Sequence, residues 1–139
     1  MTNIPISKWT KEVSASVQVT DPVWKAWRAM KDYDVKILPV SSGGRIVGIV
    51  SSQDIVRASD HNGGQSMSVK EAMSLDPIVV NRSTSVVNVV YKMIEKDQQH
   101  SVVVDDDSNI VGIFSWSEVF LFFLEQNEIE FPISQGRFK

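Results

Sequence analysis

Cysteine is absent from this chain of 139 residues. Its absence excludes disulfide bonds, thiolate zinc sites and cysteine nucleophiles together. An excess of positive charge is absent as well, because 14 lysines and arginines face 17 aspartates and glutamates, which gives a net charge of −3. Binding along a nucleic-acid duplex needs a basic surface, so nucleic acid is not expected as a partner.

Long apolar runs are also missing. No stretch approaches the roughly 18 apolar residues that span a bilayer, and the opening residues, MTNIPISKWTKE, lack the apolar segment of a secretory signal. We therefore expect no membrane partner and a cytoplasmic location. Apolar residues still make up 42% of the chain, and a chain of this length buries roughly two-thirds of its unfolded surface. The composition predicts a globular protein.

An internal repeat is the main feature that the chain does have. The segment GIVSSQD, residues 48–54, returns as GIFSWSE, residues 112–118. Amphipathic helix stripes at i, i+3, i+4 and i+7 precede both segments. The stripes are Val23, Ala26, Trp27 and Met30 in the first copy, and Val86, Val89, Val90 and Met93 in the second.

Each copy is predicted to have the order strand, helix, strand, strand, helix. The expected strands are 17–19, 37–40 and 45–50, then 78–80, 102–104 and 110–114, and the closing helices are 51–58 and 115–124. A capping-box pattern at Ser68–Glu71 predicts a further short helix. Insertions belong in loops, and matching the apolar positions suggests that the first copy is shorter in two loops. It lacks two residues at Thr20–Pro22, before its first helix, and one residue between that helix and the next strand.

The polar segment 59–66 is predicted to be a surface linker. The expected domains are therefore 1–66, with the N-terminal segment and first repeat, and 67–139, with the second repeat, a C-terminal helix and a tail.

Two such units in tandem, each ending in glycine–apolar–apolar–Ser–x–x–acid at a helix start, resemble a pair of cystathionine β-synthase (CBS) domains. The resemblance covers about residues 15–58 and 67–124. It implies an α/β fold in which two CBS-type repeats pack with pseudo-twofold symmetry. It also implies a regulatory module that binds an adenosine-containing ligand in the cleft between its repeats and forms a homodimer through its helices.

The resemblance also implies residue roles. The acid of the motif, which contacts ribose hydroxyls, falls on Asp54 and Glu118, and the hydroxyl residue on Ser51 and Ser115. The basic position near the phosphates falls on Lys36 and His100. The adenine-bracketing positions of the first site are Val17, Val19, Thr20, Ile37 and Pro39, and those of the second, weaker site are Ile78, Val80, Asn81 and Val102.

Elementary chemistry fits these roles but leaves an alternative for each. A carboxylate can accept hydrogen bonds from two vicinal hydroxyls, and a helix N-terminus suits phosphate. Ser-x-x-acid is equally a plain capping box. We favour ribose contact for Asp54 and capping for Glu118, whose longer side chain and neighbour Trp116 crowd the cleft. The apparently shortened loop before the first helix weighs against the first site, and the lack of a proline at Val103 against the second.

Other polar signals have simpler interpretations. His61 lies in the linker and is expected to be exposed, and Asp105–Asp107 fits a solvated turn better than a cation site. No metal site is expected.

Aromatic and apolar residues point to buried surfaces. Trp24 and Trp27, with Val23 and Met30, are expected in the core or a dimer interface. The run Phe120–Leu124 is too apolar for a wholly exposed helix, so we expect cover from a second protomer or from the tail through Phe131 and Phe138.

Three functions follow in order of preference. The first is a regulatory sensor of AMP, ADP or ATP, with no cofactor of its own and an unidentified protein as its target; S-adenosylmethionine is an alternative ligand. The second is a ligand-free assembly module in which both Ser-x-x-acid boxes only cap helices. Catalysis comes last, because the chain has no G-x-S-x-G elbow and no P-loop, and its two histidines lack evident acidic partners.

Overall fold

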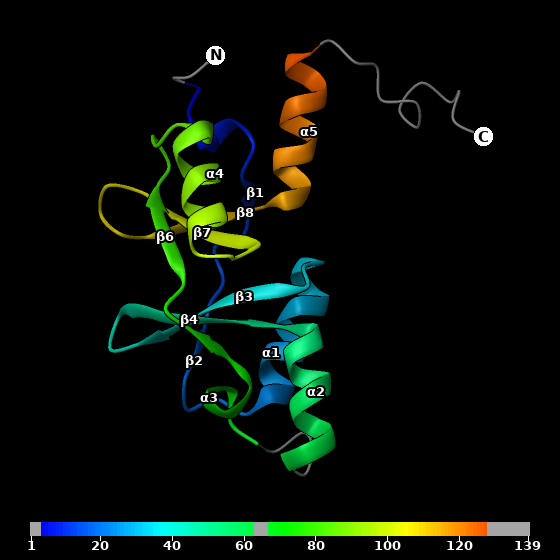
Figure 1. Cartoon of the computed structure of the whole chain (residues 1–139). Helices are drawn as coiled ribbons and strands as arrows, with labels where there is room; N and C mark the ends of the chain where they lie inside the picture. The colour runs from blue at the N-terminus through cyan, green and yellow to red at the C-terminus, as the bar shows by residue number, and fades with distance from the viewer. Residues whose placement is uncertain (1–3, 63–66, 128–139) are drawn as a thin grey trace, which may run out of the picture. The chain divides into compact units, whose positions relative to one another are not determined.

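The protein is described by a computed structural model covering residues 4–62 and 67–127, without the side chains of residues 61 and 62. The backbone divides into two compact units, residues 13–79 and residues 1–12 with 80–139. Both mix helices with a sheet (Figure 1). The α/β class and the two repeats predicted from the sequence are confirmed, whereas the pseudo-twofold packing and the domain limits 1–66 and 67–139 stay predictions.

The unit 13–79 has a four-stranded sheet in the order β2-β3-β4-β5. β2 is parallel to β3, and the other neighbours are antiparallel. Its elements are β2 (Val17–Gln18), α1 (Val23–Tyr33), β3 (Ile37–Ser42), β4 (Arg45–Ser51), α2 (Ser52–Asn62), α3 (Val69–Ala72) and β5 (Ser74–Leu75).

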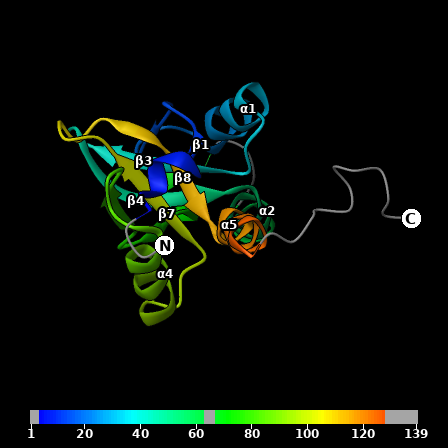
Figure 2. The same ribbon diagram turned by 90° about the horizontal axis from the view of Figure 1, so that it is seen from above.

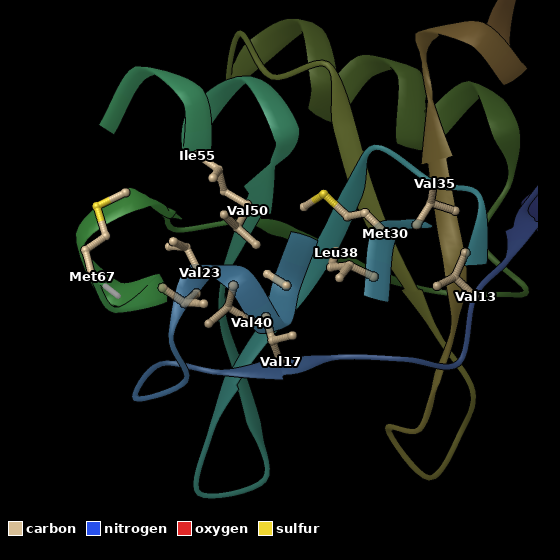
Figure 3. Packing of buried hydrophobic residues seen from close by; sticks show 12 residues of the cluster. Val13, Val17, Val23, Met30, Val35, Leu38, Val40, Val50, Ile55 and Met67 are labelled. Carbon is tan, nitrogen blue, oxygen red and sulfur yellow. The ribbon is translucent and has the colours of Figure 1, made fainter. Parts of the chain in front are cut away.

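The core of this unit lies between α1, α2 and the sheet (Figure 3). α1 buries Val23, Ala26 and Met30, three positions on one side of a 3.6-residue period. They pack in one cluster with the strand residues Leu38 and Val50, neither of which retains exposed surface. Apolar burial of this kind contributes about 25 cal/mol per Å2, so α1 is held mainly by its buried stripe.

The β3–β4 hairpin turns through Gly43 and Gly44. Their φ angles are +58° and +80°, which matches the two left-handed residues of a type I′ turn. Glycine adopts this region without the steric cost that a Cβ imposes, which explains the SSGG sequence at the turn.

The second unit has a sheet in the order β1-β8-β7-β6. Its elements are the 3-10 helix η1 (Ile6–Lys8), β1 (Lys11–Glu12), β6 (Ile78–Asn81), α4 (Val86–Glu95), β7 (His100–Val104), β8 (Ile110–Ser115) and α5 (Trp116–Gln126). α4 buries Val86, Val89 and Met93, and α5 buries Val119 and Phe122. Within this unit α4 and α5 stand apart in both views (Figures 1 and 2).

Each unit takes a short segment from the other half of the sequence. The Val69 N–H donates to the Asp21 carbonyl at 2.7 Å, and the Ile6 N–H donates to the Thr84 carbonyl at 2.9 Å. β5 pairs with β4 at Gly48, and β1 pairs with β8 at Gly112. Sequence inspection did not anticipate these edge strands, because two-residue strands carry almost no periodic signal.

The hydrogen bonds correct the expected spacing of the repeats. The Val19 N–H donates to the Ser41 carbonyl, and the Arg82 N–H donates to the Val104 carbonyl, so both members of the second pair are numbered 63 higher. The same shift of 63 relates the left-handed residues Asp34 and Asp97, which follow α1 and α4.

The strand pairing locates the single inserted residue. Val40 pairs with Gly48 in the first unit, and Val103 pairs with Gly112 in the second. The extra residue therefore lies in the second hairpin. The predicted two-residue shortening before the first helix is wrong, and so is the one-residue shortening after it. Apolar character is misleading there, because it pairs Val19 with Val80, whereas the structural counterpart of Val19 is Arg82.

One further expectation changes, and two lie outside the described residues. The linker predicted at 59–66 is wrong at its start, because α2 continues to Asn62. The predicted burial of Phe131 and Phe138 concerns residues outside those described, and the side chain of His61 is outside them too.

Candidate ligand-binding site

The first candidate site is built where β3 begins and β4 ends. Ile37 pairs in register with Ser51, and the Ser52 N–H donates to the Lys36 carbonyl at 2.9 Å. The strand pairing thus brings Lys36, Ile37 and Ser51 together at the N-terminus of α2. Pro39 follows on the same strand, opposite Ile49.

Asp54 and Ser51 form a reciprocal cap at this helix start. The Ser51 N–H donates to Oδ2 of Asp54 at 3.0 Å, and the Asp54 N–H donates to Oγ of Ser51 at 3.0 Å. The other carboxylate oxygen, Oδ1, lies 3.5 Å from Nη1 of Arg57. The capping interpretation is therefore present in the structure, and one oxygen of Asp54 is held only by an ion pair.

Arg57 was not among the residues singled out from the sequence. Its side chain is 70% exposed, whereas that of Asp54 is 16% exposed. An exposed i,i+3 ion pair contributes only a few tenths of a kcal/mol, so Arg57 can leave Asp54 at little cost. The signal that could have found it is a basic residue three positions after the acid on one helix.

The remaining residues of the first site lie on the other side of β3 from Ser51. Val17 pairs with Val40, the Val19 N–H bonds Ser41, and Thr20 is exposed in the following turn. The structure therefore groups Val17, Val19 and Thr20 along one edge of β3, and Lys36, Ser51 and Asp54 along the other.

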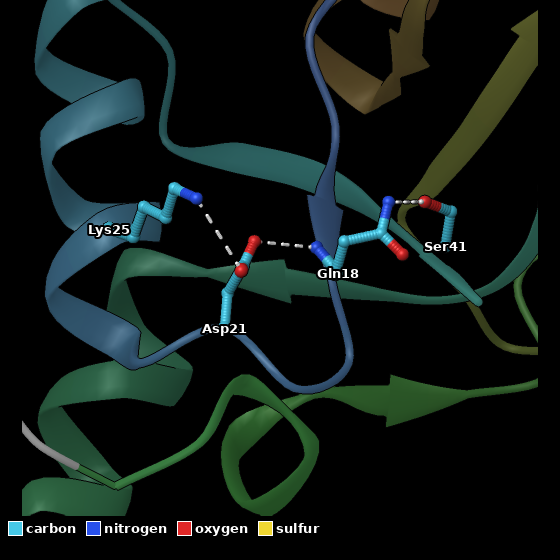
Figure 4. A network of polar contacts seen from close by, with 4 residues as sticks. All are labelled: Gln18, Asp21, Lys25 and Ser41. Atoms are coloured by element: carbon cyan, nitrogen blue, oxygen red, sulfur yellow. Dashed lines mark hydrogen bonds and ion pairs between the residues drawn. The ribbon is translucent and has the colours of Figure 1, made fainter. Parts of the chain in front are cut away.

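A polar network fixes the turn that contains Thr20 (Figure 4). The Gln18 N–H donates to Oδ2 of Asp21 at 2.9 Å, and the Gln18 side chain donates to Oγ of Ser41 at 3.0 Å. Lys25 lies 3.6 Å from Oδ1 of Asp21. The backbone of residues 18–21 is thereby tied to both β3 and α1, which gives the turn a defined shape without any deletion.

The second helix start is capped by Glu118. A single oxygen, Oε1, accepts the Ser115 N–H at 2.8 Å and the Ser115 hydroxyl at 2.6 Å. The counterpart of Arg57 on α5 is Leu121, an apolar residue. The longer side chain of Glu118 thus folds back onto the cap, as expected for a reciprocal capping box.

The strand register changes which residues correspond between the two sites. His100 pairs with Ser115 as Ile37 pairs with Ser51. The Trp116 N–H donates to the Gln99 carbonyl at 3.2 Å, so Gln99 is the structural counterpart of Lys36. The predicted correspondence of Lys36 with His100 is therefore wrong by one residue. For the same reason the counterpart of Pro39 in the second repeat is Val102 and not Val103.

Burial separates the candidate residues into two kinds. Val17 and Ile37 are buried, as are Ile78, Val80 and Val102, so they shape the strands around a ligand. Ser51, Asp54, Asn81, His100, Ser115 and Glu118 are half-buried, and Thr20 and Lys36 are exposed. Only this second kind offers polar side chains to a ligand.

Asn81 is engaged by neighbouring polar groups. Its side chain donates to Oδ1 of Asp106 at 2.9 Å and accepts the Ser83 N–H at 2.8 Å. Asp105 accepts the N–H groups of Asp107 and Asn109, both at 2.9 Å. These bonds lower the pKa of Asp105, the largest contribution coming from the Asn109 N–H. The acidic run is thus a hydrogen-bonded turn, as its solvated-turn interpretation expects.

The described residues place some exposed aromatics outside the core. Trp24 and Trp27 are 44% and 43% exposed on α1, so they do not belong to the core of this chain. Of the two predicted places, the dimer interface stays a prediction. Both tryptophans border a hollow of about 290 Å3 between α1 and α2. Of the run Phe120–Leu124, Phe122 is buried and contacts Trp9 edge-on with ring centroids 5.5 Å apart.

Metal ligation and membrane spanning can be assessed for residues 4–62 and 67–127. These ranges contain no group of three or more histidine, aspartate or glutamate side chains placed to hold an ion. In the same ranges no helix has the length and apolar character to cross a bilayer.

Comparison with known families decides the relationship. The CBS domain model matches residues 9–61 and again residues 69–125. The chain belongs to the CBS domain family. The two matches coincide with the two repeats.

Curated relatives carry this family as part of larger proteins. The chain is 30% identical over 105 residues to an inosine-5'-monophosphate dehydrogenase of Korarchaeum cryptofilum, which covers 76% of this chain and 21% of that protein. It is 34% identical over 102 residues to a homoserine O-acetyltransferase of Methanocorpusculum labreanum, covering 72% and 20%. The chain spans about a fifth of the length of these two relatives.

Solved structures share the fold over most of the chain. An uncharacterised conserved protein from Pyrococcus horikoshii matches with 27% identity and a TM-score of 0.71, covering 88% of this chain and 94% of that chain. The CBS domain pair of MJ0100, solved with 5'-methylthioadenosine and S-adenosyl-L-methionine, matches with 22% identity and a TM-score of 0.74, covering 88% and 97%. CBSX2, solved with AMP, matches with 20% identity and a TM-score of 0.71, covering 89% and 99%.

Proposed function

We propose that this CBS pair is a regulatory module that binds an adenosine-containing ligand, with AMP, ADP or ATP preferred over S-adenosylmethionine. Asp54 is its main ribose contact, and Lys36 lies near the phosphates. The second site, around Ser115 and Glu118, is weaker. We propose no catalytic role and no cofactor, and a cytoplasmic location and an unidentified target protein stay predictions.

The proposal rests on one observation: the two carboxylate oxygens of Asp54 have different partners. Oδ2 accepts the cap bond from Ser51, while Oδ1 faces the exposed guanidinium of Arg57. A ribose diol can take the place of Arg57 at Oδ1 and leave the helix cap intact. The released Arg57 then remains near the ligand as a cation, in a position suited to a phosphate.

Two further findings support an adenosine ligand. The corrected register gives the first repeat a full-length turn before α1. A shortened loop therefore no longer argues against ligand binding at the first site. MJ0100 and CBSX2, which share the fold, were solved with adenosine-containing molecules. Binding would regulate a target only if the ligand favours one arrangement of the protein over another.

Titration calorimetry with AMP, ADP, ATP and S-adenosylmethionine tests the proposal. We expect saturable binding of at least one nucleotide and a loss of about tenfold or more in affinity in Asp54→Ala. Glu118→Ala is the comparison variant, because it removes the capping acid of the second, weaker site, and its loss in affinity should be smaller than that of Asp54→Ala. Absence of binding for all four ligands, or an equal loss in both variants, contradicts the assignment.

Arg57→Ala sharpens the same test. Removing the competing cation from Oδ1 is expected to leave adenosine binding unchanged or slightly tighter, and to weaken ATP binding. A weakened affinity for adenosine itself would show that Arg57 acts on the ribose or the base.

A second candidate function is that of an assembly module without a ligand. The exposed aromatics of α1 and α5 favour it, since apolar groups of this size on a helix surface are typical of interfaces. We propose a homodimer through these helices in either case. The two functions differ in whether nucleotide changes the stability or the target of the dimer.

A further inference from the structure

A further hollow, the α1-end hollow, lies where α1 ends and next to residues assigned to the first site. Its volume is about 270 Å3, and its border includes Trp27 and Lys31 of α1, Asp34 and Lys36 of the turn that follows, and Ser52 at the start of α2. One water needs roughly 10–15 Å3, so the hollow has room for polar groups larger than water. All of its lining residues belong to the unit 13–79.

The turn after α1 fixes the backbone that carries the two lysines. Asp34 has a left-handed conformation with φ of 53°, and its N–H donates to the Lys31 carbonyl at 3.3 Å. Two residues later, the Lys36 carbonyl accepts the Ser52 N–H at 2.9 Å. Lys31 and Lys36 are therefore held on the border of the same hollow, although they come from different elements.

The α1-end hollow has an excess of positive charge. Lys31 and Lys36 are exposed, and in the part of the chain that the structure describes no ion pair includes either of them. Asp34 also lines the hollow, so two lysines and one aspartate give +1. Met30 and Val35 are buried and form an apolar side. Cations beside such low-dielectric walls concentrate a positive potential, which suits an anionic group.

The hollow continues the first site. Ser52 borders it and directly follows Ser51, the cap partner of Asp54. Lys36, the cation proposed to lie near the phosphates, borders it as well. A phosphate beside Lys36 is therefore at the edge of the hollow, and Lys31 is the second cation available to the same ligand.

The second repeat has neither of these cations. With the shift of 63, the counterparts of Lys31 and Lys36 are Ile94 and Gln99. Ile94 is 58% exposed, so an apolar side chain stands at the surface where the first repeat has a charge. The cationic or titratable side chains that the second repeat has nearby correspond to positions that do not line the hollow: Lys92 to Ala29, Lys96 to Tyr33 and His100 to Ile37.

We propose that the α1-end hollow is a subsite for the distal phosphates of a nucleotide bound at the first site, and that Lys31 sets a preference for ATP and ADP over AMP. The inference rests on the proposed binding of an adenine nucleotide and adds its phosphate count. Lys36 serves the phosphate nearest the ribose, which all three nucleotides have. Lys31 serves the phosphates that only ADP and ATP have, so the second repeat is expected to show no such preference.

Calorimetry with adenosine, AMP, ADP and ATP tests the subsite. In the unmodified protein, affinity should rise from AMP to ADP and ATP. Lys31→Gln removes the charge and keeps a polar side chain, so it should weaken ADP and ATP binding about twofold to fivefold, as expected for one exposed cation, and leave AMP and adenosine unchanged. An equal loss for AMP and ATP, or AMP binding as tightly as ATP to the unmodified protein, overturns the proposal.

Lys70→Gln is the matched control for this variant. It removes an exposed lysine from α3 of the same unit, outside the hollow, and should leave all four affinities unchanged. A loss of ATP affinity equal to that of Lys31→Gln would show that only the overall charge matters, which contradicts the subsite. Circular dichroism verifies that both variants fold, and a rise in ionic strength should reduce the preference for ATP more in the unmodified protein than in Lys31→Gln.

Transfer of the two cations to the second repeat is an independent measurement. The double variant Ile94→Lys/Gln99→Lys places lysines at both corresponding positions, and the exposure of Ile94 makes the change compatible with folding. We expect a second, tighter step of ATP binding and no change for adenosine. An ATP isotherm identical to that of the unmodified protein contradicts the role assigned to these positions.

The outcomes separate this inference from the proposed function. If AMP binds and is lost in Asp54→Ala, while Lys31→Gln leaves ATP unaffected, the subsite is wrong and nucleotide binding stands. If none of the four ligands binds, both proposals fail.

Discussion

At the helix start of the first repeat, one oxygen of Asp54 accepts the cap bond and the other faces Arg57. In the second repeat, one oxygen of Glu118 accepts both bonds of the cap, and Leu121 stands where the first repeat has Arg57. Lys36 of the first repeat corresponds to Gln99 of the second, and Ile37 to His100. These differences sit on backbones that repeat residue by residue with one insertion.

Some positions of the repeat serve the fold, and others are free to change. The strand glycines Gly48 and Gly112, the buried stripes and the Ser-x-x-acid caps recur, because strand pairing and helix starts need them in both units. The charged positions around the caps do not recur. We infer that selection of a ligand, where it occurs, rests on those variable positions.

The glycines give the largest expected effect. A Cβ on Gly48 would lie 2.5 Å from the Ser74 carbonyl oxygen, and one on Gly112 would lie 2.8 Å from the Lys11 carbonyl carbon and overlap the attached oxygen. Either alanine must push away an edge strand, which we expect to cost about 3 kcal/mol or more. Gly112→Ala should be the worse, because it meets more of the facing backbone.

Chemical denaturation of both variants measures this cost. Gly43→Ala is the control, since a Cβ there meets nothing within 4 Å and only the positive φ of 58° opposes it, at about 1 kcal/mol. If Gly48→Ala and Gly112→Ala cost no more than Gly43→Ala, the edge strands β1 and β5 do not press on these glycines in solution.

Sequence patterns predicted the elements that have a clear period. The stripes at Val23–Met30 and Val86–Met93 became α1 and α4, and the apolar runs became strands, because burial of one face imposes the period. The Ser-x-x-acid boxes were found for the same local reason, since a cap depends on four consecutive residues.

Features set by distant partners could not be predicted. β1 and β5 each join the sheet of the other half of the sequence. Their pairing with β8 and β4 depends on hydrogen bonds between distant residues, which leave no local sequence pattern. The register of Gln99 and His100 depends on one residue in the hairpin turn, and a one-residue slip changes which side chain faces the site. Arg57 could not be predicted because its role depends on Oδ1 of Asp54, the carboxylate oxygen that the helix cap does not use.

Exchange of the basic position between repeats gives a smaller effect. Lys36→Ala is expected to weaken ATP binding by about twofold to fivefold and adenosine binding hardly at all, because an exposed cation acts on phosphate charge and contributes at most about 1 kcal/mol. Gln99→Lys, which places the same cation in the second repeat, should strengthen ATP binding at the weaker site. Calorimetry at low and high salt measures both.

Screening by salt supplies the internal control for this exchange, since only a Coulombic contribution falls with ionic strength. Lys70→Ala, a change of the same exposed charge on α3, should leave both ligands unaffected. An equal loss of adenosine and ATP in Lys36→Ala would show that the side chain supports the site instead of contacting phosphate.

The smallest effect concerns the one inserted residue and the turn that accommodates it. The N–H of Asn109, then its side-chain amide and the N–H of Asp107, hold the pKa of Asp105 below its ordinary value of 3.8. A lowered folded-state pKa means that the turn gains stability above about pH 4 and loses it as pH falls through the folded-state pKa. Asp105→Asn should therefore have a slightly lower melting temperature at pH 7, and the difference from the unmodified chain should shrink in acid. Asp107→Asn is the control: it removes the same charge, but Asp107 serves the turn through its backbone N–H, so the melting temperature of this variant should follow that of the unmodified chain. If the deficit of Asp105→Asn stays constant from pH 7 to pH 3, the turn depends on the shape of the side chain and not on the ionised carboxylate.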